Sequence, residues 1–375
     1  MSESEKQTAL ISLQHTALTK VGAKSLVARG RAELRAREEA EEWFKKGLEF
    51  CQKKRELDAS TNPHPIATSA RLAFALARRS PALFEEAFAC FERGVQLNPN
   101  HPGLQFWLGI LLHQGLGVQQ DYVEGATWYR EAAEQGLPAA QFNLGDAYSS
   151  GKGVTQDHAQ AAFWYCKAAE QGLAAAQISF GYAYAFGQGV AQDDAQAAQW
   201  YRKAAEQGLP DAQNSLGYLY ASGRGVIQDY TQAAFWYRKS AEGEFAEAQN
   251  NFGNAYAHGQ GVVQDYTLAA FWYRKAAEQG SAAAQYSLAN LYHNGQGVTR
   301  DHTEATFWWC KAAEHGNADA QWWLGIAYYY GKGVPQDYVM ADLWYRKAAE
   351  QKEKYALRKF GDSVCDEFAR LNWPE

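Results

Sequence analysis

The sequence lacks the features that would direct a protein into or across a membrane. Its 375 residues contain no run of about eighteen or more apolar residues, the length that a membrane span needs. The N-terminal stretch MSESEKQTALISLQHTALTK has no basic start followed by an apolar core and a small-residue cleavage site. These absences predict a cytoplasmic protein with no membrane span.

Cysteine is scarce and scattered. The five cysteines are an odd number, form no CxxC motif and lie far apart, at Cys51, Cys90, Cys166, Cys310 and Cys365. This pattern argues against a zinc site or a disulfide framework and favours isolated thiols in a reducing compartment. The nine histidines show no His-x-x-x-His spacing, and none clusters with acidic residues in a way that suggests a metal site; Glu314 and His315, for example, are adjacent in sequence and would point apart on a helix. We therefore predict no metal, no cofactor and no catalytic residue.

Positive charge is not in excess either. The chain has 36 Lys+Arg against 42 Asp+Glu, a net charge of −6 and an estimated pI of 5.9. Proteins that bind nucleic acids usually present a basic face to the phosphates, so we expect no nucleic-acid partner. What the chain does contain in abundance is aromatic residues, which make up 14% of it.

Many of these aromatic residues belong to a repeat of 36 residues that recurs seven times without an insertion. One tryptophan per copy keeps this interval: Trp128, Trp164, Trp200, Trp236, Trp272, Trp308 and Trp344. A glutamine series from Gln105 to Gln321 and an aspartate series from Asp121 to Asp337 keep it as well. Copies in one register predict an array of similar structural units.

Each copy predicts two helices. In the second copy the first helix spans about residues 139–150, and Gly151 or Gly153 can end it in a left-handed conformation. Asp157 is expected to cap the next helix, with Gln160 in the capping-box position three residues later. In the fourth copy the helix-ending glycine position holds Glu244, with Gly243 one residue earlier, so that helix is expected to stop sooner.

The second helix is expected to bury its tryptophan. Its apolar stripe in the second copy consists of Ala161, Trp164, Tyr165 and Ala168. Gly145 of the first helix, which becomes Ala289 in the sixth copy, predicts a close approach of a neighbouring helix. The position before the tryptophan could form a second exposed binding face, but core packing is the favoured interpretation for Phe163, Phe235, Phe271 and Phe307.

The array occupies residues 101–352. Residues 1–60 are predicted to form an N-terminal helical segment, and residues 61–100 a helix pair whose second helix resembles that of a tetratricopeptide repeat. Residues 353–375 lose the template and are predicted to form a capping helix over the open end of the array.

The seven copies resemble Sel1-like repeats, which are related to tetratricopeptide repeats. The matching motifs are Ala-x-x-Leu-Gly-x-x-Tyr, Gly-x-Gly-Val, Asp-Tyr-x-x-Ala, Trp-Tyr and Ala-Ala-Glu-Gln-Gly. The resemblance implies an all-α fold, a right-handed superhelical solenoid of antiparallel helix pairs. It also implies a scaffold or adaptor that binds proteins, mostly in bacteria, with no shared catalytic residues.

Residues that vary within the repeating frame are the candidates for binding a partner. Two columns on the first helix, three residues apart, are almost free of charge and share one helix face. We predict that this face lines a concave groove and binds another protein or a peptide segment. The candidates are Trp107, Asn143, Asp146, Tyr182, Tyr218, Asn251, Asn254, Asn290 and Trp323. The alternative is that these residues only form hydrogen bonds between neighbouring repeats.

Two other kinds of function can be compared with this hypothesis. Some cysteine-rich relatives of the family bind or hydrolyse β-lactams, and the stretch from Ser149 to Lys152 matches Ser-x-x-Lys. However, it straddles a helix end and a glycine turn, no Lys-Thr-Gly motif accompanies it, and the paired cysteines are absent. The remaining alternative is a structural array that assembles with itself.

Overall fold

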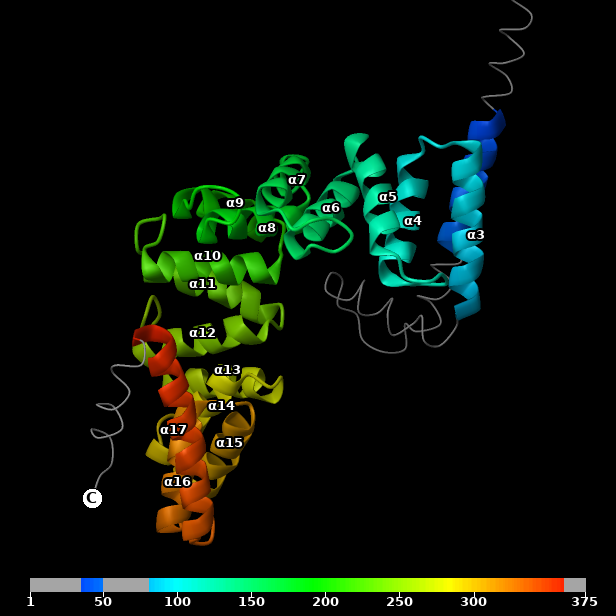
Figure 1. Cartoon of the computed structure of the whole chain (residues 1–375). Coiled ribbons are helices and arrows are strands. Elements are labelled where there is room, and N and C mark those ends of the chain that lie inside the picture. Colours follow the sequence, from blue (N-terminus) through cyan, green and yellow to red (C-terminus); the bar gives the residue numbers. More distant parts are fainter. Residues whose placement is uncertain (1–34, 50–80, 361–375) are drawn as a thin grey trace, which may run out of the picture. The chain divides into compact units, whose positions relative to one another are not determined.

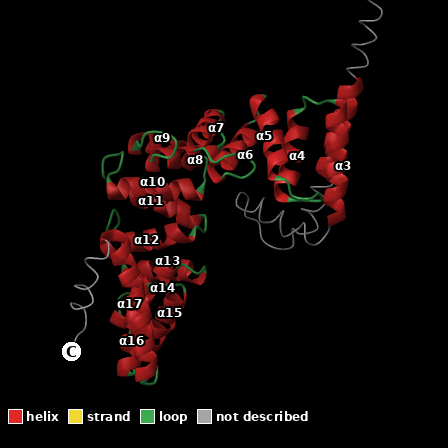
Figure 2. Ribbon diagram, in the orientation of Figure 1, coloured by secondary structure: helices red, strands yellow, loops and turns green. Residues whose placement is uncertain are grey.

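The computed structural model describes residues 35–49 and 81–360 (Figure 1). Within these ranges the chain forms 16 helices and no strand, which confirms the predicted all-α class (Figure 2). The chain divides into two compact units, Met1–Ala183 with Gln188–Ala191 and Tyr184–Gly187 with Gln192–Glu375. We call them unit 1 and unit 2.

The first described helix of unit 1 covers residues 35–49, which fall inside the predicted N-terminal helical segment. Five complete helices and most of a sixth follow: α3 (Pro81–Leu97), α4 (Pro102–Gln114), α5 (Tyr122–Glu134), α6 (Pro138–Ser150), α7 (His158–Glu170) and α8 (Ala174–Phe186). α3 packs against α4, as the second helix of a preceding pair would. The predicted first helix of that pair, at residues 65–80, lies outside the described residues.

Unit 2 holds the rest of the array. Its helices are α9 (Asp194–Glu206), α10 (Pro210–Ser222), α11 (Tyr230–Glu242), α12 (Ala246–His258), α13 (Tyr266–Glu278), α14 (Ala282–Asn294), α15 (His302–Glu314), α16 (Ala318–Tyr330) and α17 (Tyr338–Phe360). Each helix packs against the next, so helix pairs stack into a solenoid. α17 runs without a break through residue 352, so the segment predicted to cap the array starts inside this helix. Its residues 361–375 lie outside the described part.

The turn between the two helices of a repeat depends on two glycines. Gly151 ends α6 with φ 71°, and Gly153 follows with φ 77°, so both take the left-handed conformation. A Cβ atom at Gly153 would lie 1.8 Å from the carbonyl oxygen of Tyr122 in the preceding repeat. Gly153 is therefore required by its backbone conformation and by the contact between repeats.

The aspartate cap forms, but the predicted capping box does not. Asp157 accepts hydrogen bonds from the backbone amides of Ala159 and Gln160 at 2.9 and 3.0 Å. Its own amide donates to the carbonyl oxygen of Tyr148 at 3.0 Å, so the Gln160 side chain is not needed there. This explains why Leu268 can occupy the same position while Asp265 still caps α13.

The repeated glutamine joins each repeat to the one before it. The buried Gln141 side chain donates to the carbonyl oxygen of Ala133 at 3.1 Å, near the end of α5. Its own oxygen accepts a hydrogen bond of 2.8 Å from Gln171. Gln249 makes the same two contacts in unit 2, with Ala241 and Gln279. The glutamine therefore satisfies buried polar groups at each junction.

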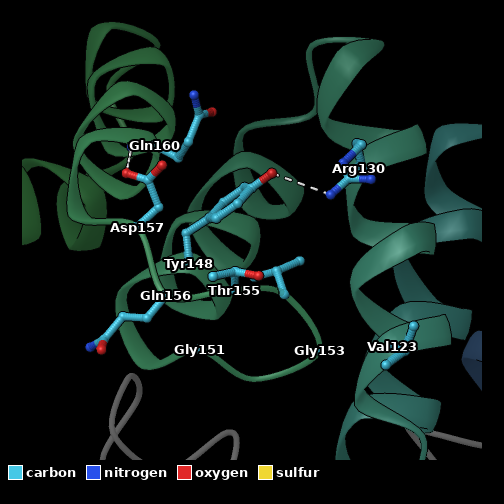
Figure 3. Close-up of a pocket in the computed structure, with 10 residues that line it drawn as sticks. Val123, Arg130, Tyr148, Gly151, Gly153, Thr155, Gln156, Asp157 and Gln160 are labelled. Carbon is cyan, nitrogen blue, oxygen red and sulfur yellow. Dashed lines mark hydrogen bonds between the residues drawn. The ribbon is translucent and has the colours of Figure 1, made fainter.

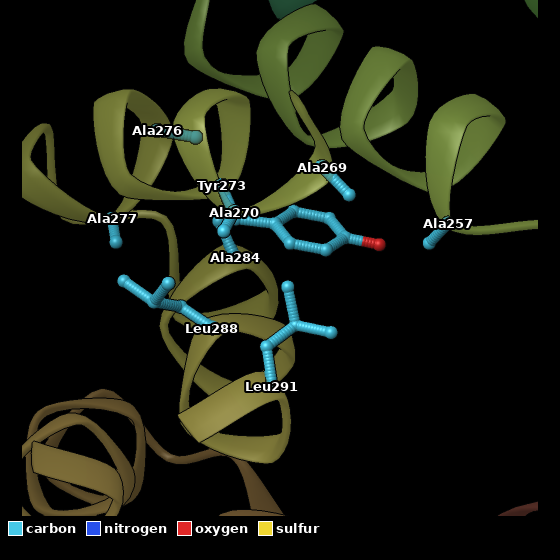
Figure 4. Packing of buried hydrophobic residues seen from close by; sticks show 9 residues of the cluster. All are labelled: Ala257, Ala269, Ala270, Tyr273, Ala276, Ala277, Ala284, Leu288 and Leu291. Atoms are coloured by element: carbon cyan, nitrogen blue, oxygen red, sulfur yellow. The ribbon is translucent and has the colours of Figure 1, made fainter. Parts of the chain in front are cut away.

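The ring at the centre of each helix pair is the residue after the tryptophan. In unit 2 the Tyr273 ring is only 3% exposed and lies among Ala257, Ala269, Leu288 and Leu291 (Figure 4). Gly253 faces this ring, because a Cβ atom there would lie 2.7 Å from its Cδ1 and Cε1 atoms. Close approach at the glycine is thus confirmed.

The prediction that the tryptophan series forms the core is wrong for most of its members. Only Trp236 and Trp344 are buried, at 8% and 9% exposed, and the other five are half-buried. The favoured core packing of the phenylalanines is also wrong, because all four are exposed: Phe163, Phe235, Phe271 and Phe307. The tyrosine faces the glycine and alanines of the helix pair and takes the buried position. The adjacent tryptophan is therefore left in a half-buried position.

The fourth copy does not shorten its second helix. α11 ends at Glu242, in the same register as α9 at Glu206 and α13 at Glu278. Glu244 instead adopts a left-handed φ of 61°, as the only residue other than glycine with positive φ in the described chain. The helix junction therefore imposes its conformation on a residue poorly suited to it.

Candidate functional site

The predicted binding residues lie on first helices of both units. In unit 1 they are Trp107 on α4, Asn143 and Asp146 on α6, and Tyr182 on α8. In unit 2 they are Tyr218 on α10, Asn251 and Asn254 on α12, Asn290 on α14, and Trp323 on α16. Within unit 2, α10 also contacts α12 directly. We call the solvent-exposed surface of the first helices of each unit its first-helix face.

The two tryptophans among the predicted binding residues pack against other aromatic rings of the protein. Trp107 stacks on Phe91, with ring centroids 5.9 Å apart and an interplanar angle of 18°. Trp323 stacks on Trp309 at 5.3 Å and 12°. Both are half-buried, so the polar residues between them are better candidates for contact with a partner.

Unit 2 brings three of the predicted residues together around one cavity. Tyr218, Asn251 and Asn254 line a cavity of about 280 Å³ together with Tyr230 and Tyr237 of α11. Tyr218 is 50% exposed, and both asparagines are half-buried. Tyr230 and Tyr237 were not predicted. The Tyr237 position holds an aromatic ring in every copy and gives no variable signal. The Tyr230 position does vary, with His158 and Asp194 in other copies, but it lies on the second helix, outside the two columns of the first helix.

The first column of asparagines contributes to the junction between repeats. Asn251 Nδ2 donates to Asn214 Oδ1 at 2.9 Å, which joins α12 to α10. Asn214 itself is buried. This bond supports the alternative that part of the column is structural, although the exposed part of Asn251 still lines the cavity.

The second column uses its side-chain oxygens internally. Tyr273 Oη donates to Asn254 Oδ1 at 2.7 Å, and Trp309 Nε1 donates to Asn290 Oδ1 at 3.1 Å. An indole N–H can only donate, so the Asn290 atom that it meets must be the oxygen. The two amide nitrogens then remain as donors, with no partner among the described residues.

Unit 1 has a carboxylate in the same column. Tyr165 Oη donates to Asp146 Oδ1 at 2.7 Å, in the way that Tyr273 bonds to Asn254. Desolvation raises the pKa of Asp146, and the hydrogen bond from Tyr165 opposes this change. Tyr165, Ser179 and Tyr182 line a small cavity of about 100 Å³. At this column position Asp146 therefore offers an acceptor where Asn254 and Asn290 offer donors.

The largest cleft among those described lies at the turn of the second repeat. It has a volume of about 980 Å³ and is lined by Arg130, Tyr148, Thr155 and Asp157, among others (Figure 3). Arg130 Nη2 donates to Tyr148 Oη at 3.2 Å, and Asp157 caps α7. Its charged groups are therefore engaged in holding the repeat together.

The Ser-x-x-Lys match does not form a catalytic pair. Ser149 lies near the end of α6, and Lys152 follows the left-handed Gly151. The Lys152 Nζ atom lies 5.7 Å from the centroid of the Tyr122 ring, in the preceding repeat. Among residues 35–49 and 81–360, no group of three His, Cys, Asp or Glu side chains is placed to hold a metal ion. No described helix is long and apolar enough to cross a membrane.

Comparison with known proteins places the array in one family. The Sel1 repeat model matches residues 104–137, 138–173, 174–209, 210–244, 246–281, 282–317 and 318–353. Comparison with curated protein sequences gives no significant match.

Two solved structures show the same arrangement. One is c5321, described as a protective antigen present in uropathogenic Escherichia coli strains and displaying an SLR fold. It is 34% identical, with a TM-score of 0.67, over 85% of this chain and 69% of that one. The other is a Sel1 repeat protein from Oxalobacter formigenes, which is 32% identical with a TM-score of 0.61 over 88% of this chain and 92% of that one.

Proposed function

Because the chain belongs to the Sel1 repeat family, whose solenoids typically act as scaffolds for protein interactions, we propose that it binds a segment of another protein on the first-helix face of unit 2. The observation that carries the proposal is the pair of amide donors on Asn254 and Asn290, which have no partner among the described residues. The exposed ring of Tyr218 lines the same cavity as Asn254. The chain acts here by binding and performs no chemistry of its own.

An extended segment suits this surface. Packed helices lie roughly 8–10 Å apart, and an extended chain advances about 3.3 Å per residue. The donors of Asn254 and Asn290 can therefore meet backbone carbonyl oxygens about three residues apart. The cavity beside Tyr218, of about 280 Å³, accommodates one apolar or aromatic side chain of the segment. Backbone recognition of this kind places few demands on the partner's sequence.

The sharpest test reverses the polarity of the donors without disturbing the fold. The double variant Asn254→Asp/Asn290→Asp keeps an oxygen for Tyr273 and Trp309 to bond. The Asp146–Tyr165 pair of unit 1 shows that this column accepts an aspartate. We expect unchanged helicity and an unfolding free energy within about 1 kcal/mol of the parent, with partner binding lost.

Binding is measured by capture from lysate of the native cells on the immobilised full chain. The retained proteins are quantified by mass spectrometry, and cross-links from the first-helix face locate the bound segment. A variant of an exposed loop residue, Val263→Thr, serves as the matched control. If the double variant captures the same proteins in the same amounts, the first-helix face is not the binding surface.

Alanine substitution tests the structural alternative. Replacing Asn251, Asn254 and Asn290 by alanine removes the bonds to Asn214, Tyr273 and Trp309. A fall in the unfolding free energy with capture unchanged would assign these asparagines to the junctions between repeats. Loss of capture at a temperature where the variant remains folded supports the proposal.

We further infer that the protein works in a reducing compartment such as the cytoplasm. Cys90, Cys166 and Cys310 are all unpaired, and burial raises the thiol pKa of each. Thiols that stay protonated resist oxidation, and unpaired thiols provide no stabilising disulfide. Both properties are typical of proteins in a reducing compartment. Subcellular fractionation with an antibody to the chain tests this location, and recovery with extracellular proteins would contradict it.

A further inference from the structure

A row of exposed apolar side chains crosses the second helices of unit 2. Phe235, Phe271, Phe307 and Leu343 occupy the same repeat position on α11, α13, α15 and α17. They are 46%, 50%, 49% and 42% exposed. Four consecutive repeats therefore place an apolar side chain at the protein surface.

The fold does not need these side chains to be apolar. The same position holds Thr127 in the first repeat and Gln199 in the third, and the helix pairs there form equally. Each phenylalanine ring contacts the neighbouring tryptophan in an edge-to-face arrangement. Phe271 and Trp272, for example, have ring centroids 5.2 Å apart at an interplanar angle of 80°. About half of each phenylalanine side chain stays exposed to solvent.

A lysine one helical turn later accompanies each member of the row. The Nζ atoms of Lys239 and Lys275 lie 4.7 and 5.0 Å from the ring centroids of Phe235 and Phe271. Lys311 lies 6.0 Å from Phe307, and Lys347 lies 4.2 Å from the Trp344 ring. These contacts hold the ammonium groups beside the apolar row. We call the combined surface the phenylalanine–lysine row.

Most of these lysines have no carboxylate partner among the described residues. Lys311 pairs with Glu314 at 3.6 Å, but Lys239, Lys275 and Lys347 form no ion pair with the described residues. Glu242, the nearest acid at the end of α11, is already paired with Arg238 at 2.8 Å. In a chain of net charge −6, a line of such cations beside aromatic rings is a distinctive surface.

We propose that the phenylalanine–lysine row is a second interaction surface, and that it binds an acidic segment of a partner protein that carries spaced apolar side chains. Apolar groups of the segment cover the exposed rings, and its carboxylates pair with the ammonium groups of Lys239, Lys275 and Lys347. The helices' own glutamates lie seven residues beyond the phenylalanines, against four for the lysines. When an apolar side chain of the partner covers a phenylalanine, the neighbouring groups of the partner lie closer to the lysine than to the glutamate. The row therefore favours segments whose neighbouring groups are carboxylates.

The test uses the full chain and two synthetic probes. One fluorescein-labelled peptide of twenty residues alternates glutamate with leucine and phenylalanine, and the other has lysine in place of every glutamate. Anisotropy is expected to show binding of the acidic probe, weakened by salt, and no comparable binding of the basic probe. Equal binding of the two probes, or no binding of the acidic one, would overturn the proposal.

Two triple variants assign the binding to the row. Phe235→Gln/Phe271→Gln/Phe307→Gln copies the glutamine at position 199, and Lys239→Glu/Lys275→Glu/Lys347→Glu reverses the cations. Each is expected to weaken the acidic probe roughly tenfold or more, because buried aromatic and charged contacts dominate interface energies. Circular dichroism melts verify folding. Unchanged affinity in either variant would refute the assignment.

If the phenylalanine–lysine row binds a second copy of the chain or a lipid surface instead, other measurements will show it. Sedimentation equilibrium that shows a dimer in the parent and a monomer in the phenylalanine variant would identify a second copy as the occupant and overturn the proposal. Flotation with phosphatidylglycerol vesicles, lost in the same variant, would identify an anionic lipid surface instead. Asn254→Asp/Asn290→Asp should leave acidic-probe affinity unchanged, so the two surfaces are tested independently.

Discussion

Replacing Gly253 by alanine is expected to destabilise unit 2, although alanine is the better helix former. The new Cβ atom would lie 2.7 Å from Cδ1 and Cε1 of Tyr273, whereas carbon atoms in contact prefer about 3.5 Å or more. The ring would have to move by about 0.8 Å. It is 3% exposed, and its hydroxyl is held by Asn254 at 2.7 Å.

The net effect follows from two opposing terms. Overpacking a dense core costs about 1–3 kcal/mol, and alanine recovers about 1 kcal/mol of helix propensity relative to glycine. We expect the unfolding free energy to fall by up to about 2 kcal/mol, measured by urea denaturation followed by circular dichroism. A stabilisation of about 1 kcal/mol, the value for propensity alone, would refute the packing argument.

The sixth repeat supplies the control. There Ala289, Asn290 and Trp309 replace the trio of Gly253, Asn254 and Tyr273, and Trp309 Nε1 donates to Asn290 as Tyr273 Oη donates to Asn254. The double variant Gly253→Ala/Tyr273→Trp recreates this arrangement in the fifth repeat. It is expected to recover part of the loss, and no recovery would show that the cost arises elsewhere.

Three further changes test the local structure. Asp265→Ala removes the acceptor for the amides of Thr267 and Leu268 and should cost about 1 kcal/mol in urea denaturation, whereas Asp265→Asn should cost less. Glu244→Gly relieves a left-handed φ of 61° and should raise the unfolding free energy by about 0.5–1 kcal/mol; a loss would show that the Glu244 side chain stabilises the junction. Burial lowers the pKa of His113 and His293 below the ordinary value of about 6.5, so the unfolded chain takes up protons first as the pH falls. Stability should therefore decrease below about pH 6.5. The double variant His113→Ala/His293→Ala, which copies the alanine that Ala257 provides at the same repeat position, should flatten that decrease in denaturation series at about pH 7.5 and 5.5.

Features that depend on spacing alone could be predicted from the sequence. The 36-residue register predicts the helix pairs, the glycine turns and the aspartate caps, because each depends on a residue type at a fixed distance from a helix end. The close approach at Gly253 could also be predicted, since its replacement by alanine in the sixth copy excludes a purely conformational role.

Features that depend on how a side chain turns could not be predicted. Trp272 and Tyr273 are adjacent, and both positions hold an aromatic ring in every copy, so periodicity cannot tell which ring the core takes. At the candidate site, variation identified Asn254 and Asn290, but not which end of each amide faces inward. That orientation is determined by a donor nineteen residues later on another helix. Glu244 shows a further limit, because packing of the whole repeat overrides a local preference.

The second glycine of each turn makes the array indivisible below one repeat. A Cβ atom at Gly153, Gly261 or Gly333 would fall within 2.0 Å of a backbone oxygen of the preceding repeat, at Tyr122, Tyr230 and His302. Each turn thus packs against the backbone of the preceding repeat. An array extended by half a copy would therefore contain one turn without this contact. Addition or removal of whole 36-residue copies keeps every such contact, whereas addition of half a copy would not. Each added copy provides the packing surface for the next one. The proposed binding faces therefore lengthen by one helix pair at a time, and the existing contacts stay unchanged.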